Sequence, residues 1–204
     1  MDLTQSQNDA LTELINIGYA RAAGALSELT GHRILLEVPQ VAIHEMTKVA
    51  TVLQPLIKGD VASVNQVFSG VIAGNAMLIL DTGAALLLNR LLTDRPEAIA
   101  LDAAAREVIV EVGNIVLNAC LGVFGNLLQV QVSFAVPALQ VESFHDVIRS
   151  IRIAGGELQY ALVIHTRFQM RASDVTGYLV IMLGVTSLER LMLELRRWED
   201  RQMA

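Results

Sequence analysis

Hydrophobic residues recur with helical spacing at the start of the chain. Between Thr4 and Leu29 they mark one side of a long amphipathic helix, which is predicted to end at Gly31 because glycine readily closes a helix in the left-handed conformation. Charged and amide residues occupy the other side. The residues on the apolar side are Leu11, Leu14, Ile15, Gly18, Ala22, Ala25, Leu26 and Leu29.

The pattern then alternates between strands and short helices. The segment 33–43 reads as a strand, with Pro39 at an edge or a bend because proline cannot donate a ladder hydrogen bond. Segments 61–70 and 75–81 read as a hairpin, and 83–92 as a short helix. The order then begins again, with a long helix to about Leu127, strands over 129–137, 141–151, 157–168 and 177–185, and a last helix.

Three residues return at a constant offset, which supports an internal duplication. Glu13, Asn16 and Pro39 recur 98 positions later as Glu111, Asn114 and Pro137, so both copies read Glu-x2-Asn-x22-Pro. We expect an α+β fold with pseudo-twofold symmetry, in which two long motif-bearing helices lie on one face of a largely antiparallel sheet. The chain, 1–204, is predicted to be one domain of two similar halves, about 1–97 and 98–204.

Both long helices carry a polar ridge. In the first helix Asp9 stands four positions before Glu13, and the spacing i, i+4, i+7 places Asp9, Glu13 and Asn16 on one ridge facing away from the apolar side. In the second helix Glu107, Glu111, Asn114 and Asn118 form a similar strip on an otherwise apolar helix. A solvated face explains the first ridge, but an asparagine in an apolar helix lowers helix propensity without an evident gain.

Composition narrows the classes of function. With 53% hydrophobic residues, the chain can bury a substantial core. A net charge of −6 with only two lysines argues against nucleic acid or an anionic membrane as partner. The start of the chain lacks the features of a signal peptide and no long apolar run is free of charges or amides, so we expect a cytoplasmic protein without membrane insertion. Cys120 is the only cysteine, and its apolar surroundings predict a packing role.

Glutamate and asparagine together suit one kind of chemistry. A carboxylate can pair with a partner's lysine, whereas a neutral carboxamide offers both a donor and an acceptor and can hold a water molecule at a chosen angle. Hydrolysis of a phosphoryl group depends largely on such positioning and on charge neutralisation. The sequence contains no convincing cluster of metal ligands, so a metal would come with the substrate. Asn118 either supports this site or serves helix packing.

The ridge with its spacing, Asp/Ser-x3-Glu-x2-Asn-x22-Pro, resembles the active-site signature of the CheC/CheX/FliY chemotaxis phosphatases. It is met by Asp9, Glu13, Asn16 and Pro39. The second copy, "EVGNIVLNACLGVFGN", resembles the family even more closely around its Glu and Asn. The resemblance covers essentially the whole chain. Because the chain has no additional switch-type domain at its C-terminal end, it is most similar to stand-alone CheC.

The resemblance implies a role for each position. Glu13 and Glu111 would pair with the active-site lysine of a phosphorylated CheY-like receiver, and Asn16 and Asn114 would orient water toward its aspartyl phosphate. The phosphatase would need no cofactor or metal of its own, because Mg²⁺ would sit in the receiver. The other signature positions would be peripheral or would shape the following strand. These supporting positions are Asp9, Glu107, Pro39 and Pro137.

Each copy departs once from the pattern. Glu107 stands where Asp or Ser is expected, and Tyr19, Ala20 and Arg21 replace a run of small residues and an amide. If both sites work, the protein acts on two receivers, and if one has decayed, that half serves as scaffold. The alternative function is that of a non-catalytic adaptor. Such an adaptor would bind either a receiver domain or a CheD-like deamidase and would act by sequestering it.

Overall fold

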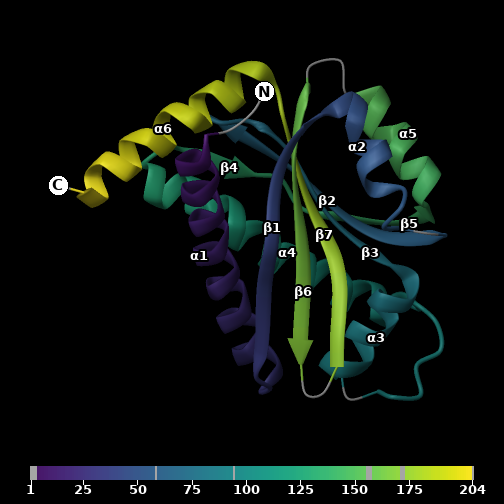
Figure 1. Ribbon diagram of the computed structural model, residues 1–204. Coiled ribbons are helices and arrows are strands. Elements are labelled where there is room, and N and C mark those ends of the chain that lie inside the picture. Colours follow the sequence, from purple (N-terminus) through teal and green to yellow (C-terminus); the bar gives the residue numbers. More distant parts are fainter. Residues whose placement is uncertain (1–3, 58, 94, 155–157, 171–172, 204) are drawn as a thin grey trace.

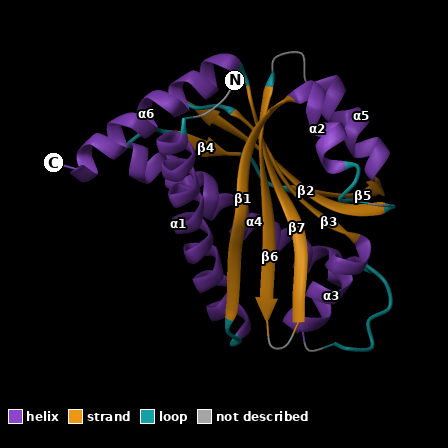
Figure 2. Cartoon of the chain, in the orientation of Figure 1, coloured by secondary structure: helices purple, strands orange, loops and turns teal. Residues whose placement is uncertain are grey.

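The computed structural model describes residues 4–57, 59–93, 95–154, 158–170 and 173–203 and forms one sheet with helices on both faces (Figures 1 and 2). The elements follow in the order α1 (Gln5–Thr30), β1 (Ile34–Glu45), α2 (Met46–Leu53), β2 (Asp60–Gly70), β3 (Gly74–Asp81), α3 (Thr82–Thr93), α4 (Ala103–Leu128), β4 (Val132–Phe134), β5 (Ala138–Ser143), α5 (Phe144–Ala154), β6 (Tyr160–Met170), β7 (Ser173–Leu183) and α6 (Val185–Met203).

The order of the elements repeats, with β4 and β5 together standing where the first half has β1. Helices α1 and α4 each contain 26 residues and begin 98 positions apart. The α+β fold with an internal duplication, predicted from the sequence, is therefore confirmed. The boundary between the halves at about residue 97 stays a prediction.

Strands from the two halves interleave in a single antiparallel sheet. The strand order is β1-β6-β7-β3-β2-β4, and β5 also pairs with β2. Thus β1, which follows α1, pairs with β6 of the second half, whereas β4 and β5, which follow α4, pair with β2 of the first half. The strand after each motif helix is held by the opposite half of the chain.

Each face of the sheet has its own hydrophobic core. Helices α1, α3, α4 and α6 bury their apolar sides on one face together with residues such as Leu78, Ile164 and Leu179. On the other face α2 and α5 pack over Val61, Met77 and Val180. The alternation along each strand explains this division, because successive side chains point to opposite faces. Both motif helices therefore lie on the same face, as predicted.

The first motif helix has well-defined ends. The Thr4 hydroxyl accepts a hydrogen bond from the Gln7 backbone N–H, and the Gln7 side chain accepts one from the Thr4 N–H, which forms a capping box. At the other end Gly31 adopts φ 68° and its N–H donates to the Ser27 carbonyl. The glycine stop predicted from the sequence is confirmed.

Two strand predictions in the second half were wrong in part. Of the segment 129–137, only Val132–Phe134 forms strand. The segment 141–151 was expected to form strand, but residues from Phe144 onward form helix α5. Its buried residues Phe144, Val147, Ile148 and Ile151 have the spacing i, i+3, i+4, i+7, which is typical of a helix that covers an apolar surface. Helix α2, at the corresponding place in the first half, was not predicted.

Helix α4 is long and apolar enough to cross a membrane by length and composition alone. Half of its most apolar window is buried inside the protein, however, and the helix packs against α1 and against the sheet. It therefore serves as a core helix in this fold.

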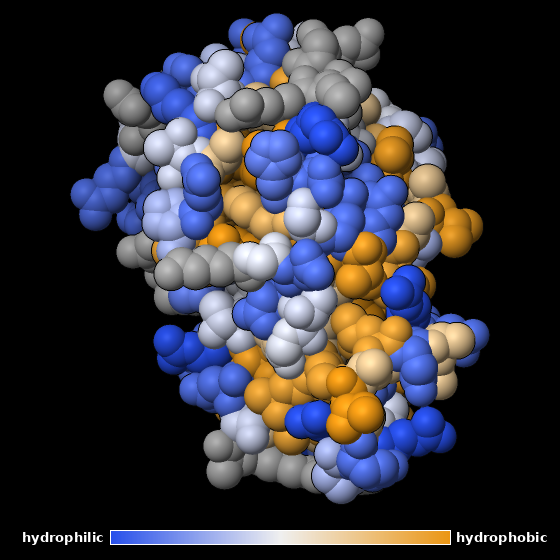
Figure 3. Space-filling model, turned by 90° about the vertical axis from the view of Figure 1, so that its right-hand side faces the viewer, coloured by the Kyte–Doolittle hydropathy of each residue, from blue (hydrophilic) through white to orange (hydrophobic). Residues whose placement is uncertain are grey.

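On the side carrying α2, α5, β5 and α3, hydrophobic residues also gather at the surface, in the middle and lower part of the view in Figure 3.

Candidate functional site

The first polar ridge lies on the surface of α1. Asp9, Glu13 and Asn16 are all exposed, while Leu11, Leu14 and Ile15 between them are completely buried. Within the described part of the chain, the three ridge side chains make no hydrogen bond or ion pair with another residue. Glu13 and Asn16 are thus one helical turn apart and available to a partner.

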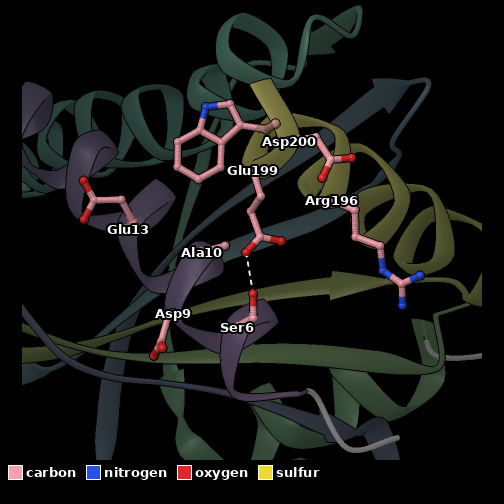
Figure 4. Close-up of a pocket in the computed structure, with 8 residues that line it drawn as sticks. Ser6, Asp9, Ala10, Glu13, Arg196, Glu199 and Asp200 are labelled. Carbon is pink, nitrogen blue, oxygen red and sulfur yellow. Dashed lines mark hydrogen bonds between the residues drawn. The ribbon is translucent and has the colours of Figure 1, made fainter. Parts of the chain in front are cut away.

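Helix α6 runs beside this ridge and forms a groove with it. The groove has a volume of about 870 Å³ and opens widely to solvent. Figure 4 shows Asp9 and Glu13 projecting from α1, with Glu199 and Asp200 projecting from α6. The Ser6 hydroxyl donates to Glu199 Oε1 at 2.6 Å, which ties the two helices together at this end. The groove is lined by Ser6, Asp9, Ala10, Glu13, Arg196, Trp198, Glu199 and Asp200.

The second ridge, on α4, is partly withdrawn from solvent. Glu107 and Glu111 are exposed, but Asn114 and Asn118 are half-buried. The Asn118 Nδ2 donates to Asn114 Oδ1 at 2.6 Å. The Asn114 amide therefore has a hydrogen-bonded neighbour, which Asn16 in the first copy lacks because the position corresponding to Asn118 is Ala20.

Gln66 on β2 belongs to the same network. Its Nε2 donates to Asn118 Oδ1 at 3.0 Å and to the Ala135 carbonyl at 3.0 Å. Gln66 is buried, and sequence reasoning missed it because it is 52 positions from Asn118. The only available signal was a polar residue inside the strand pattern of segment 61–70.

The two signature prolines lie where strand pairing is interrupted. Pro39 is inside β1, an edge strand, and the register of β1 against β6 shifts between Glu37 and Gln40. The side chain of Pro39 lies outside the described residues. Pro137 lies in the three-residue break between β4 and β5. Neither position adds a charge or an amide to the ridges.

Tyr19, one of the departures in the first copy, points into the core. It is almost completely buried, and its hydroxyl hydrogen-bonds with that of Thr166 on β6. Burial raises the pKa of Tyr19 well above its usual range. Ala20 and Arg21 are exposed. The aromatic ring therefore does not crowd the ridge of Glu13 and Asn16.

Among the described residues, no three His, Cys, Asp or Glu side chains come together in a group that could hold a metal ion. The acidic ridge residues are spread along their helices and are separated by apolar positions. The chemistry available to the ridges is therefore charge pairing through the carboxylates and hydrogen bonding through the amides.

Known proteins share this sequence and fold along nearly the whole chain. No protein-family model matches it. It is 24% identical over 203 residues to a Bacillus subtilis (strain 168) protein named CheY-P phosphatase CheC, and the alignment covers 95% of each chain. FliY of Thermotoga maritima has a TM-score of 0.80 and 19% identity, covering 97% of this chain and all of that one. CheX of Vibrio vulnificus has a TM-score of 0.52 and 14% identity, covering 83% and 98%.

The antiparallel sheet with two long helices on one face is the fold of Thermotoga maritima FliY, and in this chain each of the two helices carries Glu-x2-Asn. In sequence the chain is similar to the Bacillus subtilis CheC, and in fold it is similar to FliY and CheX, which are the members of the CheC/CheX/FliY phosphatase family that the motif resembles. The family resemblance drawn from the spaced motif is thereby confirmed.

Proposed function

We propose that this protein hydrolyses the aspartyl phosphate of a CheY-like response regulator and so terminates a chemotaxis or related two-component signal in the cytoplasm. The observation that carries the proposal is the exposed pair of Glu13 and Asn16, one helical turn apart and without a partner among the described residues. The name of the Bacillus subtilis relative, CheY-P phosphatase, supports the choice of substrate.

The receiver would supply most of the reacting groups. Its aspartate would carry the phosphoryl group, its Mg²⁺ would neutralise charge on the phosphoryl oxygens, and its active-site lysine would add a second positive charge beside them. Glu13 or Glu111 would pair with that lysine and fix the orientation of the docked receiver. Asn16 or Asn114 would then reach the phosphoryl group and hold a water molecule in line for attack on phosphorus, with departure of the aspartate carboxylate.

The two ridges lie on neighbouring helices of the same face, so one chain presents two docking positions. They differ in form. The first ridge is exposed and borders the groove against α6, whereas the Asn114 amide of the second ridge is half-buried. We expect both to act on receivers, with different affinities and rates.

A non-catalytic adaptor that binds receivers or a CheD-like deamidase is the second candidate. Both functions predict that Glu13→Lys with Glu111→Lys weakens receiver binding, because a lysine would repel the receiver's own lysine. They differ for the amides. In the phosphatase, Asn16→Ala with Asn114→Ala lowers the rate of phosphate release by about 100-fold while receiver binding persists. In the adaptor, wild type and the Asn variant release phosphate at the same slow rate as the receiver alone.

A further inference from the structure

The second ridge contains a chain of three side-chain amides that runs from the surface of α4 into the sheet. Gln66 donates to Asn118, and Asn118 donates to Asn114. We propose that Asn118 is a positioning residue for the second site, which holds the Asn114 amide in one orientation, and that Gln66 anchors it. This inference rests on the proposed phosphatase function.

A backbone carbonyl fixes which amide donates and which accepts in this series of side-chain hydrogen bonds. A carbonyl oxygen can only accept, so the Gln66 group that contacts Ala135 O is its NH₂. The second hydrogen of the same NH₂ then points at Asn118 and requires the Asn118 oxygen to face it. The nitrogen of Asn118 is left to face Asn114, whose oxygen accepts at 2.6 Å. Each amide thus sets the orientation of the next.

The strand break at Pro137 provides the anchor. Ala135 lies in the interval between β4 and β5, where its N–H donates to the Val67 carbonyl at 2.9 Å while its own carbonyl accepts from Gln66. In a regular ladder, the backbone N–H and carbonyl of such a residue would both pair with the neighbouring strand, and the carbonyl would not be left to accept from Gln66. The proline that belongs to the motif therefore lies two positions from the acceptor at the base of the amide chain.

The consequence at the surface is a fixed amide. With its oxygen engaged by Asn118, Asn114 has its NH₂ group left over, and this group has no partner among the described residues. Asn16 has no such support, because Ala20 offers no donor and the side chain is exposed. A group that is already held in place loses less rotational freedom when the receiver docks. The second site is therefore the preorganised one.

The test isolates each site in the full-length chain. In an Asn16→Ala background only the second site can turn over, and there Asn118→Ala should lower kcat about 10-fold with KM unchanged. In an Asn114→Ala background only the first site can act, and there the same Asn118→Ala change should leave phosphate release unaltered. A phosphorylated CheY-type receiver is the substrate in both arms. The second background is the matched control for damage to the fold.

An NMR measurement gives a readout that does not depend on activity. The side-chain NH₂ of Asn114 should be more rigid than that of Asn16 in the wild-type chain, and Asn118→Ala should bring the two to the same mobility. Equal mobility in the wild-type chain would overturn the inference, as would an unchanged kcat in the first background or an equal loss of turnover in both. If no variant or wild type releases phosphate, the proposed function fails, while the NMR comparison still decides the positioning role.

Discussion

Gly18 of α1 lies directly against Cys120 of α4. A Cβ atom placed on Gly18 would come within 2.9 Å of the Cys120 Cα, a distance that real Cβ contacts do not reach. The two motif helices therefore approach each other at this point as closely as their backbones permit. Because Gly18 is only two residues beyond Asn16, this contact fixes how far apart the two ridges stand on the shared face.

We predict that Gly18→Ala destabilises the protein, although alanine is the better helix former. The added methyl group must push against the α4 backbone, and overpacking of this kind costs about 1–3 kcal/mol. Gly24 is the matched control, because it lies in the same helix with open space around it. Gly24→Ala should stabilise by about 0.5–1 kcal/mol. Denaturant unfolding of both variants measures this, and a stabilised Gly18→Ala would show that the helices are loosely packed.

The stability of the protein should fall at alkaline pH because of Cys120. Burial raises the pKa of this thiol well above its ordinary value. In the unfolded chain the thiol ionises near pH 8.5. Between that pH and the raised folded pKa, the unfolded state has lost a proton that the folded state keeps, so the free energy of unfolding falls as pH rises. The stabilisation is complete below about pH 8, where neither state has ionised.

The expected slope from Cys120 is at most about 1.4 kcal/mol per pH unit. The Cys120→Ala variant lacks the thiol and should show a flatter dependence between about pH 8.5 and 10. Tyr19, whose pKa is also raised by burial, adds its own decline only above about pH 10 in both proteins. Urea titrations across this range test the prediction. Identical slopes for wild type and Cys120→Ala would mean that the thiol is accessible to water in the folded state.

Trp198 should report receiver binding at the first site. It is the only tryptophan in the chain, it is partly buried, and it lines the groove that contains Asp9 and Glu13. Docking on this ridge excludes water from the groove, so the fluorescence of Trp198 should change when a tryptophan-free receiver is added. The change should be lost in Glu13→Lys and retained in Glu111→Lys. A response that follows Glu111 instead would place the receiver away from α6.

Much of the fold could be predicted because its signals are local. The helical spacing of apolar residues, the Gly31 stop and the short apolar runs of β2 and β3 are each patterns among residues that are close in sequence. The offset of 98 positions then linked the two halves. Helix α5 was predicted as strand because its β-branched residues Val147, Ile148 and Ile151 favour strand propensity, although their spacing is helical. In that segment the helical spacing of the apolar residues indicated the structure better than their strand propensity did.

The candidate site was only partly predictable. The ridge of Asp9, Glu13 and Asn16 follows from helix geometry alone, and all three side chains are exposed as expected. The difference between the two sites depends on long-range contacts. Gln66 reaches Asn118 only because β2 pairs with the strands of the other half, and α6 reaches the first ridge only in the folded chain. No spacing in the sequence indicates these contacts.

The most direct test of the phosphatase assignment is the number of phosphates released per protein molecule. A phosphorylated CheY-type receiver is placed in large molar excess over the protein, and inorganic phosphate is followed with time. We predict that wild type releases many equivalents faster than the receiver does alone, and that Asn16→Ala with Asn114→Ala lowers the accelerated rate by about 100-fold. Release by the double variant at the wild-type rate, or no acceleration by wild type, would show that the protein is not this phosphatase.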